Sequence, residues 1–188
     1  MTSFLKIAEG INIAPLQMAL VRQPELFGRR TLRADRYDSP HTQMTDIWVR
    51  YNEYANLERS PATFNDEHDS VWYPEAECIP EVRGVVMSLM AHVGGERLGG
   101  VLITKIPPGG GIAPHVDTGW HAEYYDKYYV PILNDAGAVF GFPDGVINAT
   151  PGEAYWFRND VPHWVKNDSQ RDRIAMIVCI RTNKSKGE

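Results

Sequence analysis

Between residues 98 and 182 the chain consists of short apolar segments separated by turn residues, and this pattern restricts the fold more than any other sequence feature. The segments are rich in β-branched and aromatic residues, which favour strands. Asp144-Gly145 lies between two of them and predicts a tight hairpin. Several short strands at this spacing are typical of a β-sandwich or barrel. The predicted strands are 99–106, 127–133, 138–142, 152–157, 163–167 and 173–181.

The first half of the chain predicts two helices and an early strand. Residues 14–26 are typical of a helix that tolerates Pro15 in its first turn. Residues 81–93 repeat apolar side chains at helical spacing, and the Gly94-Gly95 pair that follows ends the helix. Residues 46–52 are typical of a strand.

These elements predict one mainly β domain over residues 1–188, since a chain of this length buries about 70% of its surface on folding. Residues 98–182 form its core, and residues 1–97 form a helical and irregular buttress packed on one face. Within the buttress, the polar region 53–80 is a candidate lid or substrate selector. The polar end, 183–188, is predicted to be a disordered tail.

Charge and cysteine content narrow the classes of function. The net charge of −5 argues against a dedicated nucleic-acid binder. No apolar run is long enough for a membrane span, and no secretory signal is visible at the N-terminus. Cys78 and Cys179 are expected to be reduced packing residues of a cytoplasmic protein. The basic cluster is either a solvated edge or a patch for an acidic substrate; it comprises Arg29, Arg30, Arg33 and Arg36.

His115 and Asp117 are the strongest candidates for chemistry. In a strand, residues two apart point to the same face, so this imidazole and this carboxylate can share one metal ion. His163, at the start of a distant strand, would complete the two-histidine, one-carboxylate triad of non-haem Fe(II) oxygenases. Such a triad leaves three octahedral positions open, enough for a bidentate 2-oxo acid and dioxygen. Zinc is not excluded, although it favours tetrahedral sites.

Arg173 indicates that the site also binds a carboxylate co-substrate. It lies ten residues after His163 on the next apolar strand. A guanidinium inside a barrel needs a carboxylate, and the distal carboxylate of 2-oxoglutarate would be a bidentate partner. The plainer interpretation is a structural His163 with a surface Arg173. The alternative function is a cupin-like metal- or ligand-binding protein without catalysis, and it gives Arg173 no reason to face inward.

Three stretches resemble the aspartyl/asparaginyl β-hydroxylase family: VLITKIPPGGGIAPHVD, KYYVPI and PGEAYWFRNDVPHWVKNDSQRDRIAMIV. The similarity spans about residues 98–181 and is most specific at His163, Asn167 and Arg173. It implies a double-stranded β-helix (jelly-roll) fold, Fe(II) and 2-oxoglutarate. It also implies hydroxylation of an Asp- or Asn-like side chain on a protein or peptide, or of a related small molecule. Substrate identity and oligomeric state stay open.

The resemblance implies further contacts with the co-substrate. A hydroxyl residue before the first histidine touches the oxo acid in the family, and Thr104 occupies that position. An Arg-x-His pair on the following strand is replaced here by Lys127 and Tyr129, which retain a positive charge and a hydrogen-bonding group. Asp117 also stands where some animal members have glycine. His121 is interpreted as a residue of a solvent-facing loop.

Overall fold

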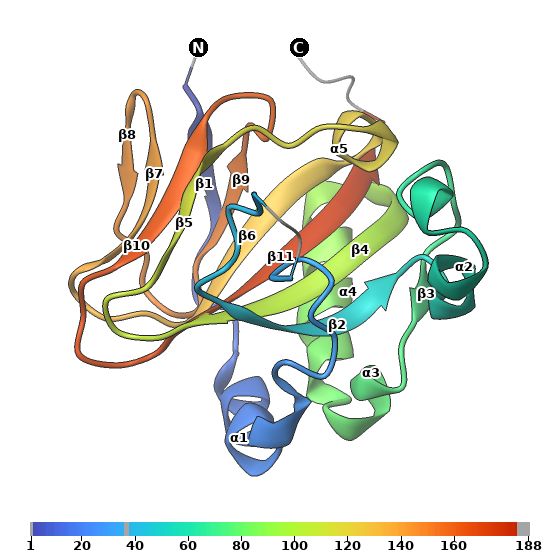
Figure 1. The fold of residues 1–188 in the computed structure, drawn as a ribbon. Coiled ribbons are helices and arrows are strands. Elements are labelled where there is room, and N and C mark those ends of the chain that lie inside the picture. Colours follow the sequence, from blue (N-terminus) through green and yellow to red (C-terminus); the bar gives the residue numbers. More distant parts are fainter. Residues whose placement is uncertain (1, 36–37, 184–188) are drawn as a thin grey trace.

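The computed structural model describes residues 2–35 and 38–183, and its strands form two facing antiparallel sheets (Figure 1). Within those residues, the larger sheet has seven strands in the order β1-β9-β6-β11-β4-β2-β3, and the smaller has four in the order β5-β10-β7-β8. The strands are β1 (Phe4–Ala8), β2 (Thr45–Tyr51), β3 (Val71–Trp72), β4 (Gly95–Ile106), β5 (Gly111–His115), β6 (Asp126–Leu133), β7 (Ala138–Phe142), β8 (Gly145–Ile147), β9 (Ala154–Phe157), β10 (His163–Asn167) and β11 (Arg173–Thr182).

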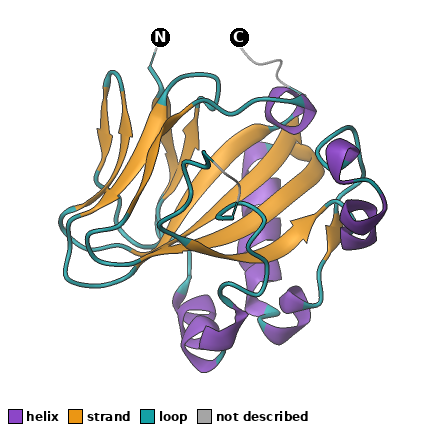
Figure 2. Cartoon of the chain, viewed as in Figure 1, coloured by secondary structure: helices purple, strands orange, loops and turns teal. Residues whose placement is uncertain are grey.

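Helices cover the outer face of the larger sheet (Figure 2). Buried residues of α1 and α4, such as Leu16 and Val86, share one core with outward-facing residues of the central strands, such as Ile103 and Val178. A second core fills the space between the two sheets and includes Phe140 and Ala175. The helices are α1 (Ala14–Arg22), α2 (Tyr54–Arg59), α3 (Glu75–Cys78), α4 (Glu81–Val93) and α5 (Trp120–Tyr124), with short 3-10 turns at Pro24–Leu26 and Pro61–Thr63.

Most of the predicted elements are present at the expected places. The predicted helix 81–93 is confirmed as α4, and it ends because Gly94 adopts the left-handed conformation, at φ 65°. The predicted helix 14–26 is shorter, because Pro24 cannot continue an α-helix and begins a 3-10 turn instead. The predicted hairpin joins β7 and β8, but its register is shifted. Phe142 pairs with Gly145, so the turn residues are Pro143 and Asp144.

The N-terminal half also contributes strands to the larger sheet. β1 was not expected, and it extends the larger sheet by pairing with β9. β2 pairs with β4 and places Asp46 beside Thr104. The region predicted to be irregular contains α2, α3 and β3. α5, immediately after β5, was also not expected.

The remaining expectations have mixed outcomes. No disulfide joins the two cysteines; Cys179 is buried as expected, whereas Cys78 is exposed and not a packing residue. Arg36 and the predicted tail at 184–188 lie outside the described residues. No helix in the part of the chain that the structure describes is long and apolar enough to cross a membrane.

The pairing of β5 with β10 depends on Gly111. A Cβ atom at this position would lie 2.6 Å from the carbonyl oxygen of Val165, a backbone atom that cannot turn away. We expect Gly111→Ala to lower the free energy of unfolding by about 1–3 kcal/mol. Gly84→Ala is the matched control, since Gly84 lies in α4 with open space around it. The free energy of unfolding of that variant should rise by about 0.5–1 kcal/mol. Urea unfolding of both variants tests these two predictions. Equal unfolding midpoints for Gly111→Ala and Gly84→Ala would contradict the steric role given to Gly111.

Candidate active site

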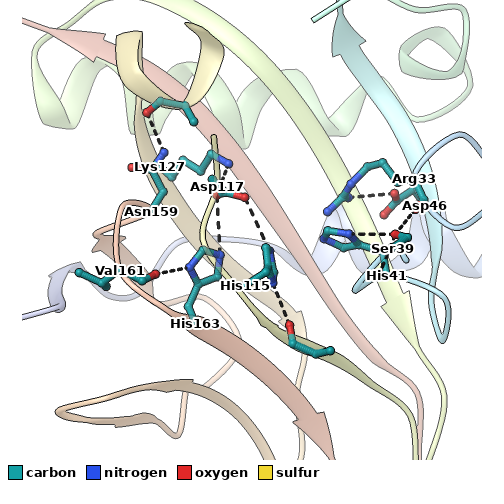
Figure 3. A network of polar contacts seen from close by, with 12 residues as sticks. Arg33, Ser39, His41, Asp46, His115, Asp117, Lys127, Asn159, Val161 and His163 are labelled. Atoms are coloured by element: carbon teal, nitrogen blue, oxygen red, sulfur yellow. Dashed lines mark hydrogen bonds and ion pairs between the residues drawn. The ribbon is translucent and has the colours of Figure 1, made fainter. Parts of the chain in front are cut away.

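β5 and β10 bring the three predicted metal ligands together (Figure 3). His115 ends β5 and His163 begins β10, and the two residues are direct cross-strand partners with ring centroids 4.4 Å apart. Asp117 lies just beyond β5, where its backbone N–H donates to the carbonyl of Asn159 over 3.0 Å. One potential ligand atom from each of the three lies within 4.8 Å of the others. The arrangement is therefore compact enough for one ion.

Backbone carbonyls fix the orientation of both imidazoles. Nδ1 of His115 lies 2.9 Å from the carbonyl oxygen of Ala113, and Nδ1 of His163 lies 2.9 Å from that of Val161. A carbonyl oxygen only accepts, so each Nδ1 carries the proton and each Nε2 offers a lone pair. The two Nε2 atoms face Asp117 at 3.6 Å and 3.7 Å. In metal sites a carbonyl that accepts from the far ring nitrogen orients a histidine ligand in this way.

Asp117 is ionised. Burial alone would raise its pKa, but the positive charge of Lys127 and the neighbouring histidines outweigh burial and hold the pKa well below its usual range. The Lys127 ammonium donates directly to a carboxylate oxygen of Asp117. Burial lowers the pKa of His163, which keeps its imidazole neutral near pH 7. Asp117 and His163 are thus in the protonation state that a metal ion requires.

Arg173, at the start of β11, is inside the barrel as predicted. Its exposure is only 3%. No described carboxylate forms an ion pair with it, and its Nε has no hydrogen-bond partner among the described residues. Its guanidinium carbon lies 5.2 Å from the ring centroid of Tyr129, which is itself fully buried. A buried guanidinium without an anion is unfavourable unless a ligand supplies one.

Thr104 also lies in the cavity, but its hydroxyl is engaged. It donates to Asp46 over 2.7 Å, and the other carboxylate oxygen of Asp46 accepts from Arg33 over 2.9 Å. The basic cluster therefore does not act as one patch. Arg33 faces the cavity, whereas Arg29 pairs with exposed Glu25 and Arg30 stacks on two tyrosines.

Two histidines differ from what the sequence suggested. His41 had no predicted role, yet its ring packs edge-on against His115 with centroids 4.9 Å apart. It lies in an irregular loop, and no sequence signal ties it to the triad. His121 is not in a solvent-facing loop: it is buried in α5, and its Nε2 accepts from the backbone N–H of Gly100 over 3.1 Å.

His41 makes stability depend on pH. Burial and the nearby charge of Arg33 lower its pKa to about 2. An unfolded histidine takes up a proton below about pH 6.5, so between these values the unfolded state binds more protons and folding weakens as the pH falls. We expect the wild-type protein to lose about 1 kcal/mol more stability than His41→Gln between pH 7 and 5.5. Urea unfolding at both pH values checks this, and identical losses would show that His41 is not the group responsible.

One cavity of about 450 Å³ connects these groups. The triad forms one wall, and Lys127, Tyr129, Thr104 and Arg173 lie on the larger sheet opposite. Pockets of 300–1,000 Å³ are typical of small-molecule sites. All seven predicted site residues therefore line one space: His115, Asp117, His163, Arg173, Thr104, Lys127 and Tyr129.

The fold is a mainly β double-stranded β-helix, and its solved structural neighbours include 2-oxoglutarate/Fe(II) oxygenase family proteins. One is such an oxidoreductase from Burkholderia pseudomallei, with TM-score 0.55 and 14% identity over 94% of this chain and 93% of that one. Another is the collagen prolyl hydroxylase of Paramecium bursaria Chlorella virus-1, solved with 2OG, with TM-score 0.58 and 11% identity over 97% of each chain.

A third neighbour is a prolyl hydroxylase from Trichoplax adhaerens, solved with a peptide fragment of the hypoxia inducible factor oxygen degradation domain. Its TM-score is 0.60 at 14% identity, over 97% of this chain and 85% of that one. No protein-family model and no curated protein matches the sequence. At these identities the likeness shows the fold, and the chemistry of the site has to be argued from its own residues.

The donor set fits Fe(II) and an oxo acid. Two imidazoles and one carboxylate on one side leave the remaining positions of an octahedral ion free. The guanidinium of Arg173, whose Nε has no hydrogen-bond partner among the described residues, fits the distal carboxylate of a dicarboxylic acid. Both features lie in the same cavity.

Proposed function

We propose that this protein is an Fe(II)- and 2-oxoglutarate-dependent dioxygenase that hydroxylates a carbon centre of its substrate. The observation that carries the proposal is Arg173, a buried guanidinium without a carboxylate partner in the described chain, in the same cavity as a two-histidine, one-aspartate triad. A metal-binding cupin without catalysis would have no use for that charge, and an unpaired buried charge costs several kcal/mol.

Each residue has a distinct part in this function. His115, Asp117 and His163 would hold the iron, with both imidazoles already aimed by backbone carbonyls. Arg173 would anchor the distal carboxylate of 2-oxoglutarate by a bidentate contact. Tyr129 supports Arg173 from one side.

Thr104 and Lys127 are proposed to contact the same molecule. Thr104 would contact the distal end through its methyl group, because its one hydroxyl proton is already donated to Asp46. Lys127, beside Asp117, would meet the carboxylate at the metal end. When bound, iron and 2-oxoglutarate supply the chemistry that couples reduction of dioxygen and oxidation of 2-oxoglutarate to succinate and CO₂ with hydroxylation of the substrate. The apolar lining, including Phe140 and Phe157, keeps water from the reacting groups.

The substrate is proposed to be an Asp- or Asn-like side chain or a related small molecule. The resemblance of residues 98–181 to the aspartyl/asparaginyl β-hydroxylases supports this assignment. The peptide bound to the Trichoplax prolyl hydroxylase is consistent with a peptide substrate on this fold.

Anaerobic addition of Fe(II) and then 2-oxoglutarate tests the function. We expect a visible charge-transfer band from the chelated complex, and no such band when Zn(II) replaces Fe(II) or succinate replaces 2-oxoglutarate. Iron binding without a band would refute the co-substrate assignment and favour a cupin-like binding protein. If the protein binds no metal at all, the triad assignment is wrong.

A further inference from the structure

The larger sheet lines one side of the cavity, and its residues change from charged and polar at one end to small and apolar at the other. On β4 and β11, cavity-facing residues alternate with core residues, from Thr104 and Arg173 at one end to Gly100 and Cys179 at the other. Six residues of strand separate Arg173 from Cys179, about 20 Å. The charged end is occupied in the proposed function by 2-oxoglutarate. The other end is therefore free for a second molecule.

Aromatic rings enclose that second end, which we call the aromatic compartment and define by Trp48, Tyr51, Gly100, Leu102 and His121. The ring of Tyr51 lies 5.4 Å from that of Trp48 and 5.1 Å from that of His121, centroid to centroid. Gly100 lets the rings approach the sheet, because a Cβ there would lie 3.0 Å from Tyr51 and 3.3 Å from His121. Flat walls of this kind favour a flat apolar group.

One polar group of the compartment has no acceptor among the described residues, and the partly exposed Arg33 lines the same cavity. The indole N–H of Trp48 is buried and has no hydrogen-bond partner among the described residues. Arg33, 27% exposed in its side chain, uses one terminal nitrogen to bind Asp46 and lies beside the compartment, in the same cavity wall as His41 (Figure 3). Because His41 packs directly against His115, only the His41 ring separates Arg33 from the proposed metal ligands.

The charges that line the cavity indicate the charge of the second molecule. The described lining residues carry three cations, Arg33, Lys127 and Arg173, and one anion, Asp117. Asp46, buried beneath Arg33, removes one more positive charge and leaves one in excess. Fe(II) and the 2-oxoglutarate dianion cancel each other. One uncompensated positive charge therefore remains, and a singly charged anion would neutralise it.

We propose that the substrate is a small monoanionic carboxylic acid with a flat apolar body. Its carboxylate pairs with Arg33, and its body lies in the aromatic compartment between Trp48, Tyr51 and His121. This inference rests on the proposed oxygenase function, and it replaces the Asp- or Asn-like side chain by a flat apolar acid as the substrate class. The buried pair of Asp46 with Arg33 and the bond from Thr104 to Asp46 hold the guanidinium in place for this contact.

Calorimetric titration of the full chain, with Mn(II) and saturating 2-oxoglutarate, tests the compartment. The ligands are phenylacetate, its neutral amide phenylacetamide, and acetate, which lacks the ring. We expect phenylacetate to bind at least about 10-fold more tightly than phenylacetamide, since a charge-assisted hydrogen bond contributes that much. It should also bind at least about 10-fold more tightly than acetate, since burial of the ring contributes a similar amount. Arg33→Gln should weaken phenylacetate about 10- to 100-fold and leave phenylacetamide unchanged.

Two variants complete the design. Arg29→Gln is the matched control, because Arg29 lies on the same segment but pairs with Glu25 at the surface, and it should bind all three ligands as the wild type does. Leu102→Phe fills the compartment and should abolish phenylacetate binding while 2-oxoglutarate binding persists. Equal affinities for acid and amide, or an Arg33→Gln variant with wild-type affinity, would overturn the proposal.

The same titrations separate this inference from the proposed function. If 2-oxoglutarate binds but phenylacetate does not, the oxygenase assignment stands and the substrate class is wrong. If 2-oxoglutarate fails to bind while phenylacetate binding to the metal-free protein still depends on Arg33, the oxygenase assignment fails and the carboxylate site stands.

Discussion

Replacing Arg173 by methionine is expected to stabilise the protein and at the same time to remove its co-substrate site. Arg173 is 3% exposed and has no carboxylate partner in the described chain. Desolvation of its charge therefore lowers the free energy of unfolding of the ligand-free protein. Substituting a buried charge by an apolar side chain of similar volume gains up to a few kcal/mol, and we expect about 2 kcal/mol here. Urea unfolding in the absence of 2-oxoglutarate measures the gain.

The same variant should bind 2-oxoglutarate roughly 100-fold more weakly, because a bidentate charged contact is lost. Titration of the charge-transfer band measures this loss, and Fe(II) affinity serves as the internal reference that stays unchanged. Arg171→Met is the matched control, since Arg171 lies two residues away but is exposed and pairs with Asp135. A destabilised Arg173→Met protein that keeps its 2-oxoglutarate affinity would mean that Arg173 is a structural residue.

Removing the His163 imidazole is expected to have the largest effect on metal binding. His163→Ala deletes one of three ligands, so Fe(II) or Mn(II) affinity should fall by more than the roughly 10- to 100-fold typical of second-shell changes. His92→Ala is the control; His92 is exposed on α4 and remote from the triad in the fold. Anaerobic metal titration compares the two.

Packing complicates this variant, because the His163 ring lies among Phe140, Phe142 and Phe157. The deletion leaves a cavity and costs about 2–3 kcal/mol of stability. Asp117→Asn avoids that problem, since it preserves shape and changes only the donor charge. Loss of metal affinity in both variants supports the triad, whereas wild-type affinity in Asp117→Asn shows that the carboxylate is not a ligand.

The sequence predicted the parts of the site that depend on local pattern. His115 and Asp117 are two residues apart, His163 opens a β-rich segment, and Arg173 starts the next one. Strand periodicity was enough to aim His115, His163 and Arg173 inward, whereas Asp117 lies beyond the end of β5 and is placed by its backbone bond to Asn159. The helix 81–93 was predictable for the same reason, because its apolar spacing and the Gly94 signal are contained within one short segment.

The other wall of the cavity depends on long-range pairing and could not be read from local pattern. Asp46 reaches the site because β2 pairs with β4, some sixty residues later in the chain. Arg33 and His41 lie in irregular loops whose positions follow from that pairing. His121 was misplaced because its burial depends on Gly100, whose missing side chain makes room for the ring.

The two imidazoles that face Asp117 each take their orientation from a carbonyl two residues earlier in their own segment, Ala113 for one and Val161 for the other. The orientation of the two imidazoles is thereby encoded in short stretches in and next to the smaller sheet. The larger sheet, α5 and a loop of the N-terminal half supply the aromatic compartment and Arg33. Substitutions there are therefore expected to change which molecules fit the cavity without changing the geometry of the proposed metal ligands, so this scaffold is suited to divergence and to redesign toward new molecules.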